Sequence, residues 1–157
     1  MRKVLALLVS GFIGIGTLKA FDDVAVDKLP KAVTEALKKR FPKGELASAS
    51  KSGEQGKEVF EVSVKEGVLK ADVNLSADGT ITGMEKQIAE KDLPKDVAAA
   101  VKSKYPTATI KLCEEVISVK DGKESLDYFE VVVETADKKT VELEIETTGK
   151  IKKENPK

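Results

Sequence analysis

Residues 29–42 read LPKAVTEALKKRFP, and residues 93–106 read LPKDVAAAVKSKYP. Both stretches begin with Leu-Pro-Lys-x-Val and end with an aromatic residue followed by proline. Proline suits the first turn of a helix, where its missing N–H leaves no hydrogen bond unmade. The residue before a proline is pushed out of the helical region. Each stretch therefore predicts one short helix, ending near Phe41 in the first and near Tyr105 in the second.

Both predicted helices carry one apolar face. Apolar residues recur at a spacing of four, while lysines and glutamates occupy the other positions, which is the pattern of a helix with one buried side. The apolar positions are Leu29, Val33, Leu37 and Phe41 in the first stretch and Leu93, Val97, Val101 and Tyr105 in the second. We expect these side chains to belong to the core.

Later landmarks recur in the same order after each helix. Phe60-Glu61-Val62 corresponds to Phe129-Glu130-Val131, and Gly79-Thr80-Ile81 corresponds to Gly149-Lys150-Ile151, with a few residues inserted in the second copy. Self-similarity of this kind is the mark of an internal duplication. The sequence predicts a first repeat over residues 21–91 and a second over residues 92–157.

Between these landmarks the apolar period changes to two. Residues 60–64, 69–75 and 141–145 alternate apolar and polar side chains, which is typical of antiparallel strands with one buried and one wet face. Weaker strands are expected near 47–51 and 110–118, with tight turns at 76–79 and 146–149. The predicted fold class is α+β. Two tandem helix-plus-antiparallel-sheet repeats, linked by residues 89–92, would share one sheet in a two-layer α/β sandwich.

The first 20 residues, MRKVLALLVSGFIGIGTLKA, have the pattern of an export signal. A short positive start precedes an apolar stretch that is too short to span a bilayer comfortably. Cleavage is expected after Ala20, with a site nearer Gly16 as the alternative. An N-terminal anchor or a buried helix is the competing interpretation. The signal predicts a periplasmic or secreted protein with no membrane insertion after cleavage.

Composition removes several classes of chemistry. The 157 residues include no His and one Cys, Cys113, so His-based catalysis, imidazole metal sites and an intramolecular disulfide are excluded. The 27 basic and 27 acidic residues balance, which gives no basic excess for nucleic acid. No phosphate loop or nucleophile elbow is present. We expect neither an enzyme nor a cofactor, and we expect Cys113 to be a small side chain packed in or beside a strand.

A group of glutamates is the candidate partner-binding surface. Alternate strand positions project from one face of a sheet, so these carboxylates should cluster. The group consists of Glu130, Glu134, Glu142, Glu144 and Glu146. It could bind a cation or a basic partner, or it could be a solvated face balanced by lysines. A faint calcium-loop pattern at Asp72, Asn74 and Asp78-Gly79 has the wrong spacing, and a turn explains its last two residues.

The L-P-x-x-V helix ending in F/Y-P, followed by strands and the D-G-T-I turn at 78–81, resembles the PepSY-like family of exported bacterial proteins. The resemblance covers nearly all of the chain after residue 20, twice over. It implies a tandem arrangement similar to the β-lactamase inhibitor protein, whose sheet face receives an enzyme loop. The resulting hypothesis is an exported, non-catalytic module that engages an envelope or secreted protein through its sheet face. Inhibition of an enzyme or protease is the specific form of this hypothesis. The alternative is a cell-envelope sensor or buffer for small ligands or cations.

Overall fold

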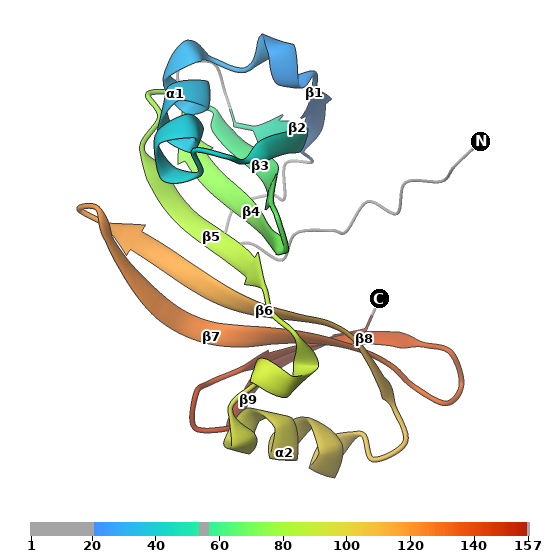
Figure 1. Ribbon diagram of the computed structural model, residues 1–157. Helices are drawn as coiled ribbons and strands as arrows, with labels where there is room; N and C mark the ends of the chain where they lie inside the picture. Colours follow the sequence, from blue (N-terminus) through green and yellow to red (C-terminus); the bar gives the residue numbers. More distant parts are fainter. Residues whose placement is uncertain (1–20, 54–56, 157) are drawn as a thin grey trace.

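The computed structural model describes residues 21–53 and 57–156. The predicted export signal over residues 1–20 lies outside the described residues. Nine strands and two α-helices make up the described chain, so the fold is mostly antiparallel sheet (Figure 1).

The two α-helices begin and end at matching positions of the repeat. Helix α1 spans Lys31–Arg40 and helix α2 spans Lys95–Lys104, each directly after its proline. The backbone N–H groups of Phe41 and Tyr105 donate to the fourth residue before them, at 2.7 and 2.8 Å. Both residues then leave the helical region, as the following prolines require. The two helices predicted from the Leu-Pro and aromatic-Pro signals are confirmed.

A short 3-10 helix precedes each α-helix. The first, η1, spans Val26–Lys28, and the second, η2, spans Glu90–Asp92. Residues 89–92, expected to be a simple link, therefore match a structural element of the first repeat.

The strands follow each other in space in the order in which they follow along the chain. Each pairs antiparallel with the next, in one nine-stranded sheet. The strands are β1 Asp22–Val24, β2 Glu45–Ser52, β3 Val59–Glu66, β4 Leu69–Ser76, β5 Ile81–Gln87, β6 Thr109–Lys120, β7 Lys123–Glu134, β8 Thr140–Ile145 and β9 Ile151–Pro156.

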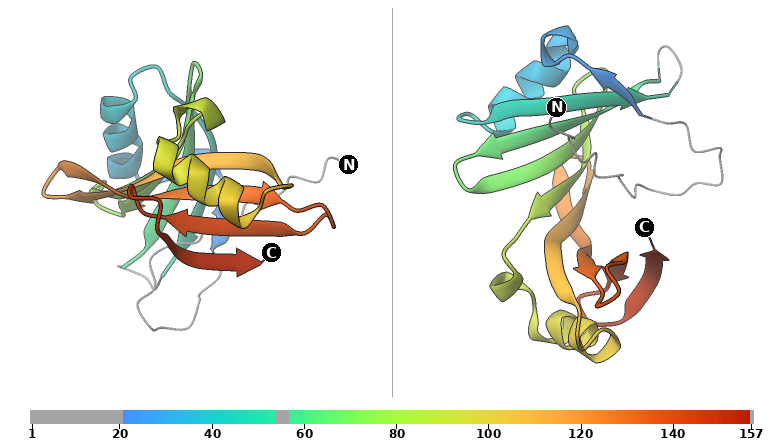
Figure 2. Two further views of the ribbon diagram at one scale, coloured as in Figure 1. Left: turned by 90° about the horizontal axis from the view of Figure 1, so that it is seen from below. Right: turned by 90° about the vertical axis from the view of Figure 1, so that its right-hand side faces the viewer.

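The pairing of β5 with β6 joins the two halves of the chain. Met84 lies opposite Ile117 and Glu85 lies opposite Val116 in this ladder. The sheet bends strongly along its length, so that α1 lies at one end of a C-shaped molecule and α2 at the other (Figure 2).

Each half has its own apolar cluster beneath its helix. Val33 and Leu37 of α1 pack among residues such as Val62, Val73 and Leu75, all with no exposed surface. Val97 and Val101 of α2 pack in the same way among Val131, Val133, Leu143 and Ile145. The strand residues between these buried positions project from the opposite side, which we call the helix-free face.

Candidate functional site

A cluster of carboxyl groups crosses the helix-free face of the sheet. One comes from each strand from β3 to β8. The residues before and after it in the chain project to the helix side of the sheet. We call this set the acidic row; it consists of Glu61, Asp72, Glu85, Glu114, Glu130 and Glu142. Asp72 lies directly opposite Glu85, and Glu114 lies directly opposite Glu130. The row therefore runs across the junction of the two repeats.

Most of the acidic row is withheld from solvent. Glu142 has no exposed surface, while Glu130 is 3% and Glu114 is 4% exposed. Each lies in an interior strand with a paired strand on either side. Glu130, for example, has Glu114 as its neighbour on β6 and Glu144 on β8. The expectation of a solvated face is wrong for Glu130 and Glu142, because neighbouring strands of the bent sheet enclose them.

Side chains of neighbouring strands donate hydrogen bonds to two members of the acidic row. Asn155 on β9 donates from Nδ2 to Glu142 Oε1 at 3.1 Å, and the Ser63 hydroxyl donates to Asp72. Within the described residues, Glu61 Oε2 and Glu130 Oε2 have no hydrogen-bond partner. A buried carboxylate oxygen without a donor is costly, and the cost falls when the group holds a proton or meets a cation.

Burial and mutual repulsion raise the pKa of several members. Burial raises the pKa of Glu130 to about 9, and the nearby carboxyls of Glu142, Glu85 and Glu114 contribute. Burial likewise raises the pKa of Glu85 to about 8, with Glu114 as the main charged neighbour. The pKa of Glu61 rises to about 7 through burial and through Asp72. These groups therefore hold protons at neutral pH to differing degrees.

The glutamates predicted from the sequence divide into two groups. Glu130, Glu142 and Glu144 lie together on the helix-free face, and Glu144 Oε1 is 3.3 Å from Lys153 Nζ. Glu134 lies at the far end of β7, where its Oε1 is 3.3 Å from Lys111 Nζ and 2.9 Å from Lys138 Nζ. Glu146 follows the end of β8, where its backbone closes the turn with Lys150.

Sequence reasoning did not include the members contributed by β3 to β6. Glu61 had already been matched to Glu130 as part of the repeat, so the duplication could have pointed to it. Glu85 and Glu114 gave no such signal, because their proximity depends on the β5–β6 pairing between the repeats.

Apolar side chains lie close to the acidic row on the same face. Val116 pairs with Tyr128 across β6 and β7, and Leu112 pairs with Val132 in the same ladder. The ring of Tyr128 lies 5.6 Å from Lys152 Nζ. Burial and the neighbouring glutamates raise the pKa of Tyr128 strongly, so its hydroxyl keeps its proton and can donate.

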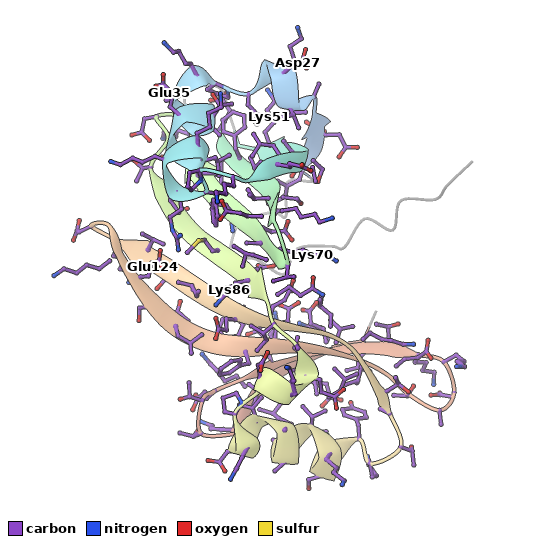
Figure 3. The ribbon with its side chains drawn as sticks, in the orientation of Figure 1. Asp27, Glu35, Lys51, Lys70, Lys86 and Glu124 are labelled. Carbon is purple, nitrogen blue, oxygen red and sulfur yellow. The ribbon has the colours of Figure 1, made fainter. Side chains whose placement is uncertain are left out.

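The helix side carries a groove between the two halves. It has a volume of about 280 Å³ and an apolar floor that includes Leu69, Met84 and Ile117. Arg40 and Glu124 border it, and their ion pair measures 3.0 Å. Figure 3 shows Glu124 on the β6–β7 hairpin and Lys86 on β5, at this same junction.

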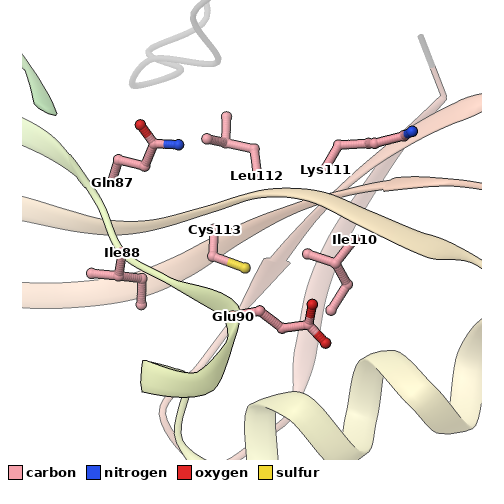
Figure 4. A pocket seen from close by; sticks show the side chains of 7 residues that line it. All are labelled: Gln87, Ile88, Glu90, Ile110, Lys111, Leu112 and Cys113. Carbon is pink, nitrogen blue, oxygen red and sulfur yellow. The ribbon is translucent and has the colours of Figure 1, made fainter.

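Cys113 lies in a smaller hollow of about 100 Å³ beside η2. Figure 4 shows its sulfur on the side of the strand that faces α2, with Leu112 projecting to the opposite side. It is 3% exposed, and burial raises the pKa of its thiol to about 11. Cys113 lies within β6, so the prediction of a small side chain packed in or beside a strand is confirmed.

The faint calcium-loop pattern ends in a turn at Asp78-Gly79 in the described residues. Asp78 Oδ1 accepts from the backbone N–H of Thr80 at 2.9 Å and from the Ser76 hydroxyl, so the turn itself uses this carboxylate. The described residues contain no group of three or more His, Cys, Asp or Glu side chains placed to hold a metal ion. Within the same residues, no helix is long and apolar enough to cross a bilayer.

The comparisons with known proteins identify a fold. No family model matches the chain. No curated protein matches it either. Among solved structures, a BLIP-like protein from Bacteroides fragilis superposes with a TM-score of 0.58 at 18% identity, over 82% of this chain and 86% of that one. A DUF2874 family protein from Bacteroides uniformis gives 0.64 at 16%, over 81% and 88%.

A third solved structure, from Bacteroides eggerthii, is provisionally described as periplasmic. It gives a TM-score of 0.65 at 13% identity, over 82% of this chain and 88% of that one. Likeness at these identities concerns the arrangement of the backbone. The chain has the fold of the BLIP-like and DUF2874 proteins.

Proposed function

We propose that this chain is an exported, non-catalytic binding module that engages an envelope or secreted protein through the helix-free face of its sheet. The observation that carries the proposal is the acidic row. A continuous sheet face that neither α-helix covers concentrates carboxyl groups, and two of their oxygens lack a donor in the described chain.

The other face of the sheet is occupied. Helices α1 and α2 lie over two apolar clusters on this face, so its side chains hold the helices against the sheet. The helix-free face contributes little to that packing and yet keeps Tyr128 and several valines beside the carboxyls. Aromatic and apolar side chains around a polar centre are common at protein interfaces.

Two of the similar solved structures support the proposal of an exported binding module. BLIP abbreviates the β-lactamase inhibitor protein, and the Bacteroides fragilis structure is described as BLIP-like. The provisional periplasmic description of the Bacteroides eggerthii protein agrees with the export signal that the first 20 residues predict. Inhibition of an enzyme is the specific form of binding that this likeness suggests.

The charge of the face argues against a nucleic-acid partner. Phosphate backbones are bound by lysine and arginine side chains. The members of the acidic row are carboxyl groups, which offer a phosphate no cation whether or not they hold a proton.

Site-specific photo-crosslinking in the producing cell tests the proposal. Asn74 lies between the buried Val73 and Leu75 on β4, so its side chain is on the helix-free face. Benzoylphenylalanine at position 74 should give a discrete crosslinked protein after irradiation. The matched control is the same residue in place of Glu35, which is exposed on α1 and lies far from that face (Figure 3). Equal products at both positions, or products at position 35 alone, would contradict the proposal.

A further inference from the structure

The groove on the helix side has an apolar floor that is partly open to solvent. Its apolar lining comes from the end of α1 and from three neighbouring strands, and consists of Phe41, Leu69, Ala71, Met84 and Ile117. Ile117 is only half-buried, and it lies directly opposite Leu126 in the β6–β7 ladder. Leu126 is 40% exposed, so the apolar surface continues from the floor onto the hairpin. Burying such a surface under an apolar group is favourable.

Two cations and one carboxylate line the same groove. Arg40 stands at the end of α1, while Lys86 lies on β5 and Glu124 on the β6–β7 hairpin (Figure 3). The Nε and Nη2 atoms of Arg40 both contact Oε1 of Glu124, at 3.1 and 3.0 Å. A guanidinium has five N–H donors, so Arg40 can hold Glu124 and also donate to a second acceptor. The lining therefore has a net positive charge, which suits an anionic ligand.

The two cations are held at the edge of the floor by weak contacts. The guanidinium of Arg40 lies 5.0 Å from the centre of the Phe41 ring. Lys86 Nζ lies 3.1 Å from a carboxylate oxygen of Glu115 on β6. The side chains of Arg40 and Lys86 are each 44% exposed, and ion pairs at this exposure contribute little because solvent screens them. Lys86 can therefore turn from Glu115 to a carboxylate in the groove at small cost.

We propose that this groove binds a medium-chain fatty acid, with the alkyl chain on the apolar floor and the carboxylate at Arg40 and Lys86. Hydrogen bonds between charged partners of this kind are short and strong. The groove volume of about 280 Å³ lies just below the range of about 300–1,000 Å³ that is usual for drug-sized ligands, which favours a small ligand. The groove is on the opposite side of the sheet from the helix-free face, so this inference does not depend on the proposed function.

An NMR titration of the protein labelled with [¹³C-methyl]methionine tests the inference. The sequence contains two methionines, Met1 and Met84, so one of two methyl signals reports on the floor of the groove. Octanoate should shift the Met84 signal and saturate it. Acetate, which has the same carboxylate and no alkyl chain, should leave that signal in place. Each CH₂ group added between hexanoate and octanoate should raise the affinity about fourfold, because it is buried against apolar side chains.

Two variants of α1 locate the carboxylate. Arg40→Gln removes a charged donor and should weaken octanoate about tenfold. Lys39→Gln is the matched control, because it removes the same charge from the exposed residue next to Arg40, outside the groove lining. It should change the affinity less than about twofold, since solvent screens exposed charges. If Arg40→Gln loses its dispersed amide spectrum, Lys86→Gln provides the same measurement from β5.

Octylammonium, which has the same alkyl chain and the opposite charge, completes the comparison. It should bind at least about tenfold more weakly than octanoate, because the carboxylate is the group that Arg40 and Lys86 bind. Equal affinities for the two ligands, or a Met84 signal that octanoate does not shift, would overturn the inference. Equal weakening by Lys39→Gln and Arg40→Gln would also overturn it, because the general charge of α1 would then explain the binding.

Discussion

Gly79 and Gly149 occupy the same position in the two repeats, in the turn that precedes the last strand of each. Both have positive φ angles, 86° and 82°. A Cβ atom added to Gly79 would lie 2.5 Å from the carbonyl oxygen of Ala32, and one added to Gly149 would lie 2.6 Å from that of Asp96. The turns therefore press against the first turns of α1 and α2, so no side chain fits there.

Replacing either of these glycines with alanine should destabilise the protein more than the same change in an open turn. We expect Gly79→Ala and Gly149→Ala each to lower the free energy of unfolding by about 2 kcal/mol or more, from backbone strain and steric conflict together. Gly67 is the control, because it also has a positive φ but nothing lies within 4 Å of an added Cβ. Urea denaturation measures all three. An equal loss for Gly67→Ala would show that the contact with the helix is unimportant.

The Cys113 thiol should be nearly inert in the folded protein. With its pKa raised to about 11 and 3% of its surface exposed, it is almost entirely protonated and shielded at pH 8. Iodoacetamide should modify it about a hundredfold more slowly than in urea, where an ordinary thiol pKa returns. Mass spectrometry of timed samples gives both rates. Similar rates in the two solvents would mean that the hollow beside η2 opens readily.

Alternation along a strand predicts which face of the sheet a glutamate is on, but it does not predict whether that face is buried. An alternating strand such as Val141-Glu142-Leu143-Glu144-Ile145 places its glutamates on one face whether that face is wet or enclosed. Enclosure depends on which strands lie on either side and on how the sheet bends. Both the neighbouring strands and the bend depend on pairing between segments that are distant in the chain. The alternation within one strand gives no information about that pairing.

At the scale of the elements, the long β6–β7 hairpin is what distinguishes the second repeat. Its far end reaches the first repeat, where Ile117 and Val119 pack against the cluster beneath α1. Arg40 Nη2 and Glu124 Oε1 form an ion pair of 3.0 Å at the same place, with both side chains 44% exposed. The apolar contact should therefore matter more than the ion pair.

Alanine substitutions at Ile117 and Glu124 compare these two contacts. Ile117→Ala should cost about 2 kcal/mol of unfolding free energy, because it removes a partly buried apolar side chain at the junction of the repeats. Glu124→Ala should cost less than about 1 kcal/mol, because solvent screens a half-exposed ion pair. Thermal denaturation of both variants provides the comparison. A larger loss for Glu124→Ala would mean that the ion pair positions the hairpin.

The elements could be predicted from the sequence to unequal degrees. Both helices follow from proline at one end and aromatic-Pro at the other, and β4 and β8 follow from clean alternation. Strand β1 has three residues, too few to show a period. Residues 119–127 read VKDGKESLD and have the composition of a loop, although pairing in the hairpin makes most of them strand.

At the scale of the whole molecule, the acidic row makes stability depend on pH. The folded pKa of Glu130 is about 9 and that of Glu85 about 8, above the ordinary value of 4.5 that each regains on unfolding. The folded protein therefore binds more protons than the unfolded chain between these limits. Its stability is greatest below about pH 4.5 as far as these groups are concerned, and it falls as the pH rises through 8 and 9.

Calorimetry from pH 5 to pH 9 should show this dependence. We expect the midpoint of thermal unfolding at pH 9 to be at least about 5 °C below that at pH 6. Glu85→Gln and Glu130→Gln, which mimic the protonated carboxyls, should each reduce the difference and raise the midpoint at pH 9. Glu35→Gln should leave the curve unchanged. A midpoint that rises towards pH 9 would show that the row is ionised and satisfied in the folded state.

The order of the strands has a consequence for how the chain acquires its structure. Each strand pairs with the one that precedes it in the chain, so no ladder waits for a distant segment. A polypeptide that appears from a ribosome or a secretion pore with its N-terminus first always has the partner of each new strand already outside. Such a chain can add one strand at a time to a growing template, and contacts between near neighbours of this kind favour rapid folding.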